Sequence, residues 1–135
     1  MKKAFSTKYT TTSVSVALLL LRIGMGGLMI PYGYKKLTHF SSWSGGFADP
    51  FHIGSGISLA LVIFAEFFCA FFVLTGLMTR LACIPIIITM TVALSYSHNW
   101  DVFGDGQKAT LFLSGFLALL FTGPGRISLD RLIGK

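Results

Sequence analysis

The sequence predicts an all-α membrane protein, arranged as an antiparallel bundle of four transmembrane helices. Of its 135 residues, 53% are hydrophobic and only 12% are charged, whereas soluble domains carry about 25% charged residues. A single small core cannot bury that much apolar surface, so lipid must cover it. The apolar residues fall into four segments, which must be helices inside a bilayer because strands would leave backbone groups without partners.

The four segments are expected to form one domain over residues 1–135. The first has about the 20 residues that a spanning helix needs. It follows a basic tail, residues 1–13, but no Ala-x-Ala-like cleavage site follows it, so we expect a retained helix rather than a signal peptide. The predicted spans are residues 14–34, 57–77, 81–98 and 107–122.

The third and fourth spans each carry a feature that needs an explanation. Pro85 lies in the first turns of the third span, where a helix tolerates proline. The fourth span is short, so we expect it to tilt little or to thin the bilayer locally. Gly123-Pro124-Gly125 ends this helix, and a basic tail, residues 126–135, follows.

The distribution of basic residues predicts the orientation. The two terminal tails and the turn at Arg80 hold seven Lys and Arg residues, and the two long loops hold three. The positive-inside rule therefore predicts cytoplasmic N- and C-termini in the inner (plasma) membrane. The net charge is +6, but the cations cluster at segment ends, which fits anionic lipid headgroups and not nucleic acid.

Two charged residues lie inside the apolar segments and are the first candidate site. A charge at the bilayer centre costs about 2.5–3.5 kcal/mol on insertion scales, so Glu66 and Arg22 each need a partner. Counted from the cytoplasmic ends, they lie about 17 Å and about 12 Å deep, and we predict that they pair. The functional interpretation is a working acid tuned by a cation, and the alternative is an ion pair that only fixes helix register.

One face of the first span is expected to pack closely against a neighbouring helix near Arg22 and Glu66. Its residues recur at helical spacing and include two glycines, which let a neighbouring backbone approach. They are Arg22, Gly26, Met29, Gly33 and Lys36.

A second candidate site lies at the predicted outer surface, where we expect a binding layer. Ser95 and His98 continue a polar stripe along the third span, and Tyr32 and Lys36 reach the same level from the first. Histidine titrates near neutral pH and can exchange a proton with a carbonyl oxygen. The alternative is a set of interfacial residues in contact with lipid headgroups.

Neither a metal site nor a covalent cofactor is predicted. The three histidines lack a short ligand spacing, and no Cys-x-x-Cys-His motif occurs for haem attachment. Cys69 and Cys83 should differ in depth by about 9 Å, too far for a disulfide. We therefore expect two free, buried thiols.

Several short motifs, in this order and spacing, resemble the DoxX family of small four-helix membrane proteins over roughly residues 17–131. They are Arg22-Ile23-Gly24, Gly33-Tyr34-Lys35-Lys36-Leu37, Ala65-Glu66, Leu74-Thr75-Gly76-Leu77-Met78-Thr79-Arg80-Leu81 and Thr122-Gly123-Pro124-Gly125-Arg126-Ile127-Ser128-Leu129-Asp130. Two departures are Tyr32, where family members often carry histidine, and Gln107-Lys108, where they often carry an acid. The resemblance implies a membrane protein connected in some relatives with quinone, thiosulfate or thiol redox chemistry.

Three functional hypotheses follow. The first is a membrane subunit of a redox system that binds a quinone or similar lipophilic molecule, with Arg22 and Glu66 below and Tyr32, Lys36 and His98 near the mouth. The second is a non-enzymatic scaffold that docks other membrane or periplasmic proteins. The third is a small transporter in which Glu66 carries protons. No redox centre is visible in the sequence, and enzymatic activity and a homo-oligomer are both left open.

Overall fold

The computed structural model describes residues 2–134, and every regular element within this range is a helix. One apolar segment forms α1 (Thr11–Thr38). A second continuous helix consists of α3 (Ser55–Ile63), the π-helical segment η2 (Phe64–Cys69) and α4 (Ala70–Thr75). A third consists of α5 (Thr79–Val92) and the π-helical segment η3 (Ala93–Ser97). The remaining elements are η1 (Lys2–Phe5), α2 (Phe40–Trp43), α6 (Gln107–Thr122) and α7 (Leu129–Ile133).

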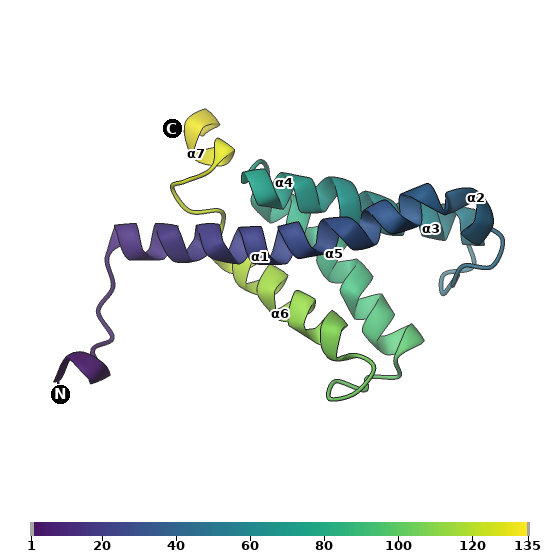
Figure 1. Cartoon of the computed structure of the whole chain (residues 1–135), viewed down its shortest axis with the longest axis horizontal. Coiled ribbons are helices and arrows are strands. Elements are labelled where there is room, and N and C mark those ends of the chain that lie inside the picture. The colour runs from purple at the N-terminus through teal and green to yellow at the C-terminus, as the bar shows by residue number, and fades with distance from the viewer. Residues whose placement is uncertain (1, 135) are drawn as a thin grey trace.

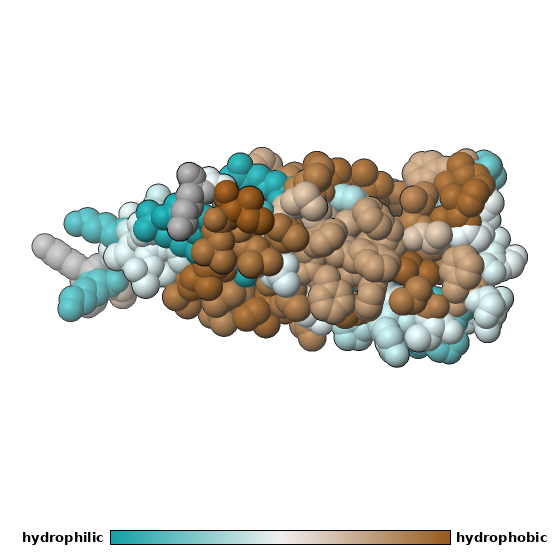
Figure 2. Space-filling view, turned by 90° about the horizontal axis from the view of Figure 1, so that it is seen from above, coloured by the Kyte–Doolittle hydropathy of each residue, from teal (hydrophilic) through white to brown (hydrophobic). Residues whose placement is uncertain are grey.

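Three of these helices are long and apolar enough to cross a membrane: Thr11–Thr38, Ser55–Thr75 and Thr79–Ser97. The apolar helix α6 is shorter, with 16 residues. Figure 2 shows apolar side chains in a broad band over the middle of the molecule, with hydrophilic side chains gathered toward both ends. Many large apolar side chains on this surface are more than 40% exposed, as expected where lipid takes the place of water.

The helices form two closely packed pairs that diverge toward one end of the molecule (Figure 1). The helix α1 packs against η2 and α4, and α5 packs along α6. In Figure 1, α5 and α6 run diagonally away from α1 and α3, so the pairs are far apart at the α2–α3 and α5–α6 loops. The cavities of the candidate site are lined by residues of both pairs.

Two glycines of α1 make its close contact with the second helix possible. A Cβ atom on Gly33 would lie 2.6 Å from the backbone nitrogen of Phe67, and one on Gly26 would lie 2.9 Å from the carbonyl oxygen of Ala70. Real side chains cannot occupy such positions without displacing the neighbouring backbone. The sequence face that carries both glycines is therefore the packing face of α1.

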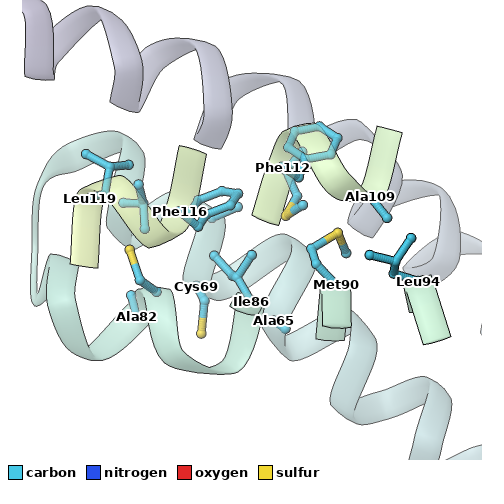
Figure 3. Packing of buried hydrophobic residues seen from close by; sticks show 14 of the residues in the cluster. Ala65, Cys69, Ala82, Ile86, Met90, Leu94, Ala109, Phe112, Phe116 and Leu119 are labelled. Carbon is cyan, nitrogen blue, oxygen red and sulfur yellow. The ribbon is translucent and has the colours of Figure 1, made fainter. Parts of the chain in front are cut away.

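Side chains from α5, α6 and the second helix pack together along the interior of the bundle (Figure 3). Phe116 and Leu119 of α6 are fully buried, as are Ile86 and Cys83 of α5. Both cysteines are buried and carry free thiols, as the sequence predicted.

The packing predicts that Gly33→Ala destabilises the protein, because the new methyl group meets backbone atoms that cannot move aside alone. Overpacking of this kind costs about 1–3 kcal/mol, so the apparent melting temperature in detergent should fall. Gly24 is the matched control, since a Cβ there would meet nothing within 4 Å. Equal melting temperatures for the Gly33→Ala and Gly24→Ala proteins would contradict the role assigned to this contact.

Candidate functional site

The buried guanidinium of Arg22 binds backbone carbonyls and not Glu66. Its Nε donates to the carbonyl oxygen of Val73 at 3.1 Å, and its Nη2 to that of Leu74 at 3.3 Å. Its Nη1 donates to the carbonyl oxygens of Pro124 and Ile127, at 2.7 and 2.6 Å. The predicted Arg22–Glu66 pair is therefore wrong.

The register between α1 and the second helix explains why the two residues do not meet. Gly33 lies against the backbone of Glu66 and Phe67, and Arg22 is eleven residues before Gly33. At 1.5 Å per residue, Arg22 is thus about 16 Å from the level of Glu66. It reaches the C-terminal end of α4 instead, where free carbonyls attract a cation.

The segment that follows α6 is held by Arg22, through the carbonyl oxygens of Pro124 and Ile127, and by Asp130. Asp130 accepts hydrogen bonds from the backbone nitrogens of Met78 and Thr79, at 2.6 and 2.9 Å, and so caps the N-terminus of α5. Its own backbone nitrogen donates to the carbonyl oxygen of Gly76 at 2.9 Å. The segment 123–130 thereby folds onto the α4–α5 turn, and we call this arrangement the tail clasp. Its role is structural.

Glu66 pairs with Lys36, a residue that the sequence assigned to the binding layer. The ammonium of Lys36 lies 2.8 Å from Oε2 and 3.1 Å from Oε1, and the hydrogen bond goes to Oε1. The side chain of Glu66 is 7% exposed and that of Lys36 is 21% exposed. Lys36 lies on α1 and Glu66 on η2, and these two helical segments are in contact at Gly33. Because glycine has no side chain, α1 comes close enough for Lys36 to reach the carboxylate of Glu66.

Two cavities meet at this ion pair. The larger, of about 330 Å³, lies between α3 and α5 under the loop that precedes α3, and its walls are mainly apolar. The smaller, of about 240 Å³, lies between α1, η3 and α6 and contains more polar groups. Both are lined by Lys36, Glu66, Met90, Ala93 and His98. The pair thus forms a common wall between an apolar and a polar cavity.

Both π-helical segments border the larger cavity. Glu66 lies in η2, and Tyr96 and Ser97 lie in or at the end of η3. A π turn widens the helix by one residue and changes which side chains face a given side, and such turns often occur at functional sites. In this protein the two π turns place the Glu66 carboxylate and the end of the third helix at the larger cavity.

The binding residues predicted from the sequence are only partly brought together. Tyr32, Lys36 and His98 line the polar cavity. Ser95 lines neither cavity, and its hydroxyl donates to the carbonyl oxygen of Val92 at 3.3 Å. The prediction stepped along a regular α-helix, whereas Ser95 lies within η3.

The cavities also contain residues that were not among the predicted binding residues. Asp105 and Lys108 line the polar cavity, and the ammonium of Lys108 lies 4.8 Å from the centre of the Tyr32 ring, a cation–π distance. Tyr96 lines the apolar cavity. Asp105 lies in the α5–α6 loop, Lys108 in the first turn of α6 and Tyr96 in a π turn. At such positions the spacing of a regular helix gives little signal.

Asp49 organises the loop that covers the apolar cavity. It accepts hydrogen bonds from the backbone nitrogens of Ile53 and Gly54, at 3.0 and 2.8 Å, and from the hydroxyl of Ser58 at 2.9 Å. Desolvation acts to raise the pKa of Asp49, but these hydrogen bonds and the nearby His52 outweigh it and hold the pKa below its ordinary value. The carboxylate also caps the start of α3.

A metal centre finds no support in the geometry. Within residues 2–134, no three side chains of His, Cys, Asp or Glu lie close enough together to hold an ion. His39 stacks on Trp43, with ring centres 4.8 Å apart, and is separate from the cavities.

The fold and the comparisons with known proteins define an integral membrane protein embedded in the lipid bilayer. It is 32% identical to the inner membrane protein YqjF of Escherichia coli, over 89% of this chain and 94% of that protein. It is also 32% identical to the E. coli inner membrane protein YphA, over 86% of this chain and 89% of that protein. The uncharacterized membrane protein Rv3486 of Mycobacterium tuberculosis is 33% identical over 52% of each chain. No solved structure gives a significant match.

The family model DoxX matches residues 17–99, more than half of the sequence. This chain belongs to the DoxX family. The matched region contains Lys36 and Glu66, which form the ion pair. It also contains Arg22 and the α4–α5 turn, onto which the segment 123–130 folds.

Arg22→Met should destabilise the protein strongly, because four carbonyl oxygens, of which that of Val73 is buried, lose a charged donor. Loss of such a group costs about 3 kcal/mol, which we expect as a fall of several degrees in the melting temperature. Arg80→Met is the control, since Arg80 is exposed and, within residues 2–134, its side chain donates one hydrogen bond, to the carbonyl oxygen of Thr122 at 3.3 Å. An Arg22→Met protein as stable as the Arg80→Met protein would exclude the structural role.

Asp49→Asn should remove a pH-dependent part of the stability. Because folding lowers the pKa of Asp49, its stabilisation is complete above the unfolded pKa of about 3.9 and is lost as the pH falls through the folded value. The melting temperatures of the wild-type and Asp49→Asn proteins should differ at pH 6 and converge below about pH 4. A difference that stays constant between pH 6 and pH 3 would disprove this linkage.

Proposed function

We propose that this protein is the membrane subunit of a redox system and binds a quinone or a similar lipophilic molecule beside Lys36 and Glu66. The observation that carries the proposal is the ion pair between buried Glu66 and partly buried Lys36, at the meeting point of an apolar and a polar cavity. Ligand sites combine mainly apolar walls with a few convergent polar groups. Buried ionisable residues within membrane segments mark such sites.

The donor and acceptor groups of the cavity suit a quinone. A Lys36 ammonium has three donors, and its hydrogen bond to Glu66 uses one of them, so others can reach a carbonyl oxygen. Glu66 orients the ammonium and balances its charge, while His98 lines both cavities and can exchange a proton. A bound quinone would supply reversible two-electron, two-proton chemistry. Because no redox centre is visible in the sequence, the electron donor or acceptor belongs to a membrane or periplasmic partner.

The proposal includes four membrane crossings with cytoplasmic termini. At 1.5 Å per residue, the 16 residues of α6 extend about 24 Å, close to the hydrocarbon thickness if the bilayer thins locally. The α6 helix then forms an antiparallel fourth span beside α5. The excess of Lys and Arg in the tails and the α4–α5 turn supports this orientation, and the cavities then open toward the outer side.

The packing favours a binding site over a proton-linked transporter. Between the level of Glu66 and that of Arg22, fully buried side chains such as Val73, Cys83 and Phe116 fill the interior. A transport path would need a polar route through this layer. A binding cavity needs access from one end only.

The proposal is tested by extracting purified protein and identifying small molecules that co-purify by mass spectrometry. We expect a quinone or similar lipophile with the wild type, and a loss of at least about tenfold in Glu66→Gln, since losing one charged hydrogen bond costs about 1.5–3 kcal/mol. The Lys36→Met/Glu66→Gln double variant should lose it too, without leaving a buried unpaired charge.

Ser95→Ala is the matched control, because Ser95 lies near the cavities but lines neither. It should retain the wild-type amount of ligand. The proposal fails if the wild-type protein yields no such molecule, or if the double variant yields as much as Ser95→Ala.

A further inference from the structure

The loop between η3 and α6, residues 98–106, presents three apolar side chains to its surroundings. Phe103 is 95% exposed, Trp100 is 60% exposed and Val102 is 37% exposed. We call these three residues the loop tip. Apolar side chains that gather on an exposed surface mark contact sites for a membrane or for another protein. The loop tip is therefore a candidate interaction surface.

The backbone of the loop holds the tip in a conformation that these residues rarely adopt. Asn99 and Trp100 both have positive φ angles, of 49° and 61°, which are unfavourable for a bulky side chain such as tryptophan. Two hydrogen bonds stabilise this turn. The backbone nitrogen of Trp100 donates to the carbonyl oxygen of Leu94 at 2.8 Å, and that of Gly106 donates to the carbonyl oxygen of Asp101 at 2.8 Å. Strain that the surrounding structure maintains in this way indicates a position with a role.

The acid inside the tip sequence forms its hydrogen bond within the loop. The carboxylate of Asp101 accepts from the backbone nitrogen of Asp105 at 3.3 Å. It also lies directly against Gly104, where a Cβ atom would overlap it. Entry of the tip side chains into an apolar environment therefore does not require Asp101 to give up this hydrogen bond.

The position of the loop relative to the bundle favours lipid as that environment. At 1.5 Å per residue, the 16 residues of α6 extend about 24 Å, whereas a hydrocarbon core is about 30 Å thick. A loop that directly precedes so short a span lies close to the hydrocarbon boundary. In Figure 1 the α5–α6 loop stops short of the α2–α3 loop along the long axis of the molecule and lies to the side of α1. Its surroundings are therefore at the level of the bilayer and not in the water beyond the bundle.

We infer that the loop tip inserts into the membrane leaflet at its end of the bundle, with Trp100 and Phe103 at the boundary between headgroups and acyl chains. Tryptophan suits this boundary because its ring is apolar and its N–H can donate to a polar group. The inserted side chains add apolar length to the short span of α6. This inference does not depend on the ligand proposed for the cavities, and it rests only on the membrane crossing proposed for α6.

Tryptophan fluorescence of the protein in lipid nanodiscs tests the insertion. The Trp43→Phe variant leaves Trp100 as its one tryptophan. The discs contain phosphatidylcholine brominated either near the headgroup end of its acyl chains or near their far ends, and bromine quenches tryptophan only at short range. We expect Trp100 to lose most of its fluorescence with the shallow bromines and less with the deep ones. Free N-acetyltryptophanamide added to the same discs gives the response of a tryptophan in water, and an equal response of Trp100 would overturn the inference.

A tryptophan on α6 separates failure of the insertion from failure of the crossing on which it rests. Leu111 of α6 is 62% exposed, and Leu111→Trp is made in a protein that also carries Trp43→Phe and Trp100→Phe. We expect stronger quenching by the deep bromines than by the shallow ones. Quenching at Leu111→Trp without quenching at Trp100 would overturn the insertion alone. Absence of lipid quenching at Leu111→Trp would overturn the crossing and the inference together.

The variant Phe103→Asp tests whether the apolar tip causes the insertion. Because Phe103 is almost fully exposed, the change removes little packing, while a carboxylate opposes entry into hydrocarbon. Quenching of Trp100 by the shallow bromines should therefore decrease, measured in the Trp43→Phe protein. Phe5→Asp is the matched control, since Phe5 is 81% exposed and lies in η1, and it should leave the quenching unchanged. Equal quenching of Trp100 in Phe103→Asp and Phe5→Asp would overturn the role of the tip.

Discussion

The approach of α1 to the second helix at Gly26 and Gly33 is the constraint on which the rest of the structure depends. Because neither glycine has a side chain, the backbones come close enough that a Cβ on Gly33 would overlap Phe67. This contact sets the register between the helices, and the register determines which groups on α1 meet which groups opposite. Arg22 is thereby placed at the end of α4, and Lys36 is placed beside Glu66.

Arg22 and Lys36, the two cations of α1 that contact the second helix, consequently have different roles. Arg22 binds four carbonyl oxygens and joins the end of α4 to the segment after α6. It makes one end of the bundle rigid and closed. Lys36 lies where the helix pairs diverge, and its partly exposed side chain lines two cavities. The same helix therefore carries a structural charge at one end and a charge available for binding at the other.

The sequence predicted the membrane class, the family, the packing face of α1 and the free cysteines, because these depend on composition and on regular helical spacing. It did not predict the partner of Glu66. Depth counted from helix ends is uncertain by a turn or more, and the register depends on Gly33 meeting the backbone at Phe67. The prediction from helical spacing that Ser95 belongs to the binding layer was also wrong, because Ser95 lies in a π turn, which changes the side chains that face the cavity. Such turns leave no regular pattern in the sequence.

Stability alone does not explain why an ion pair occupies this position. Burying two charges costs several kcal/mol of desolvation, and replacing such a pair with well-packed apolar residues is often neutral or stabilising. The structural charge of this protein, Arg22, has all of its hydrogen bonds directed to fixed backbone groups. Lys36 and Glu66 are paired with each other and line two cavities, and that difference is what a binding role requires.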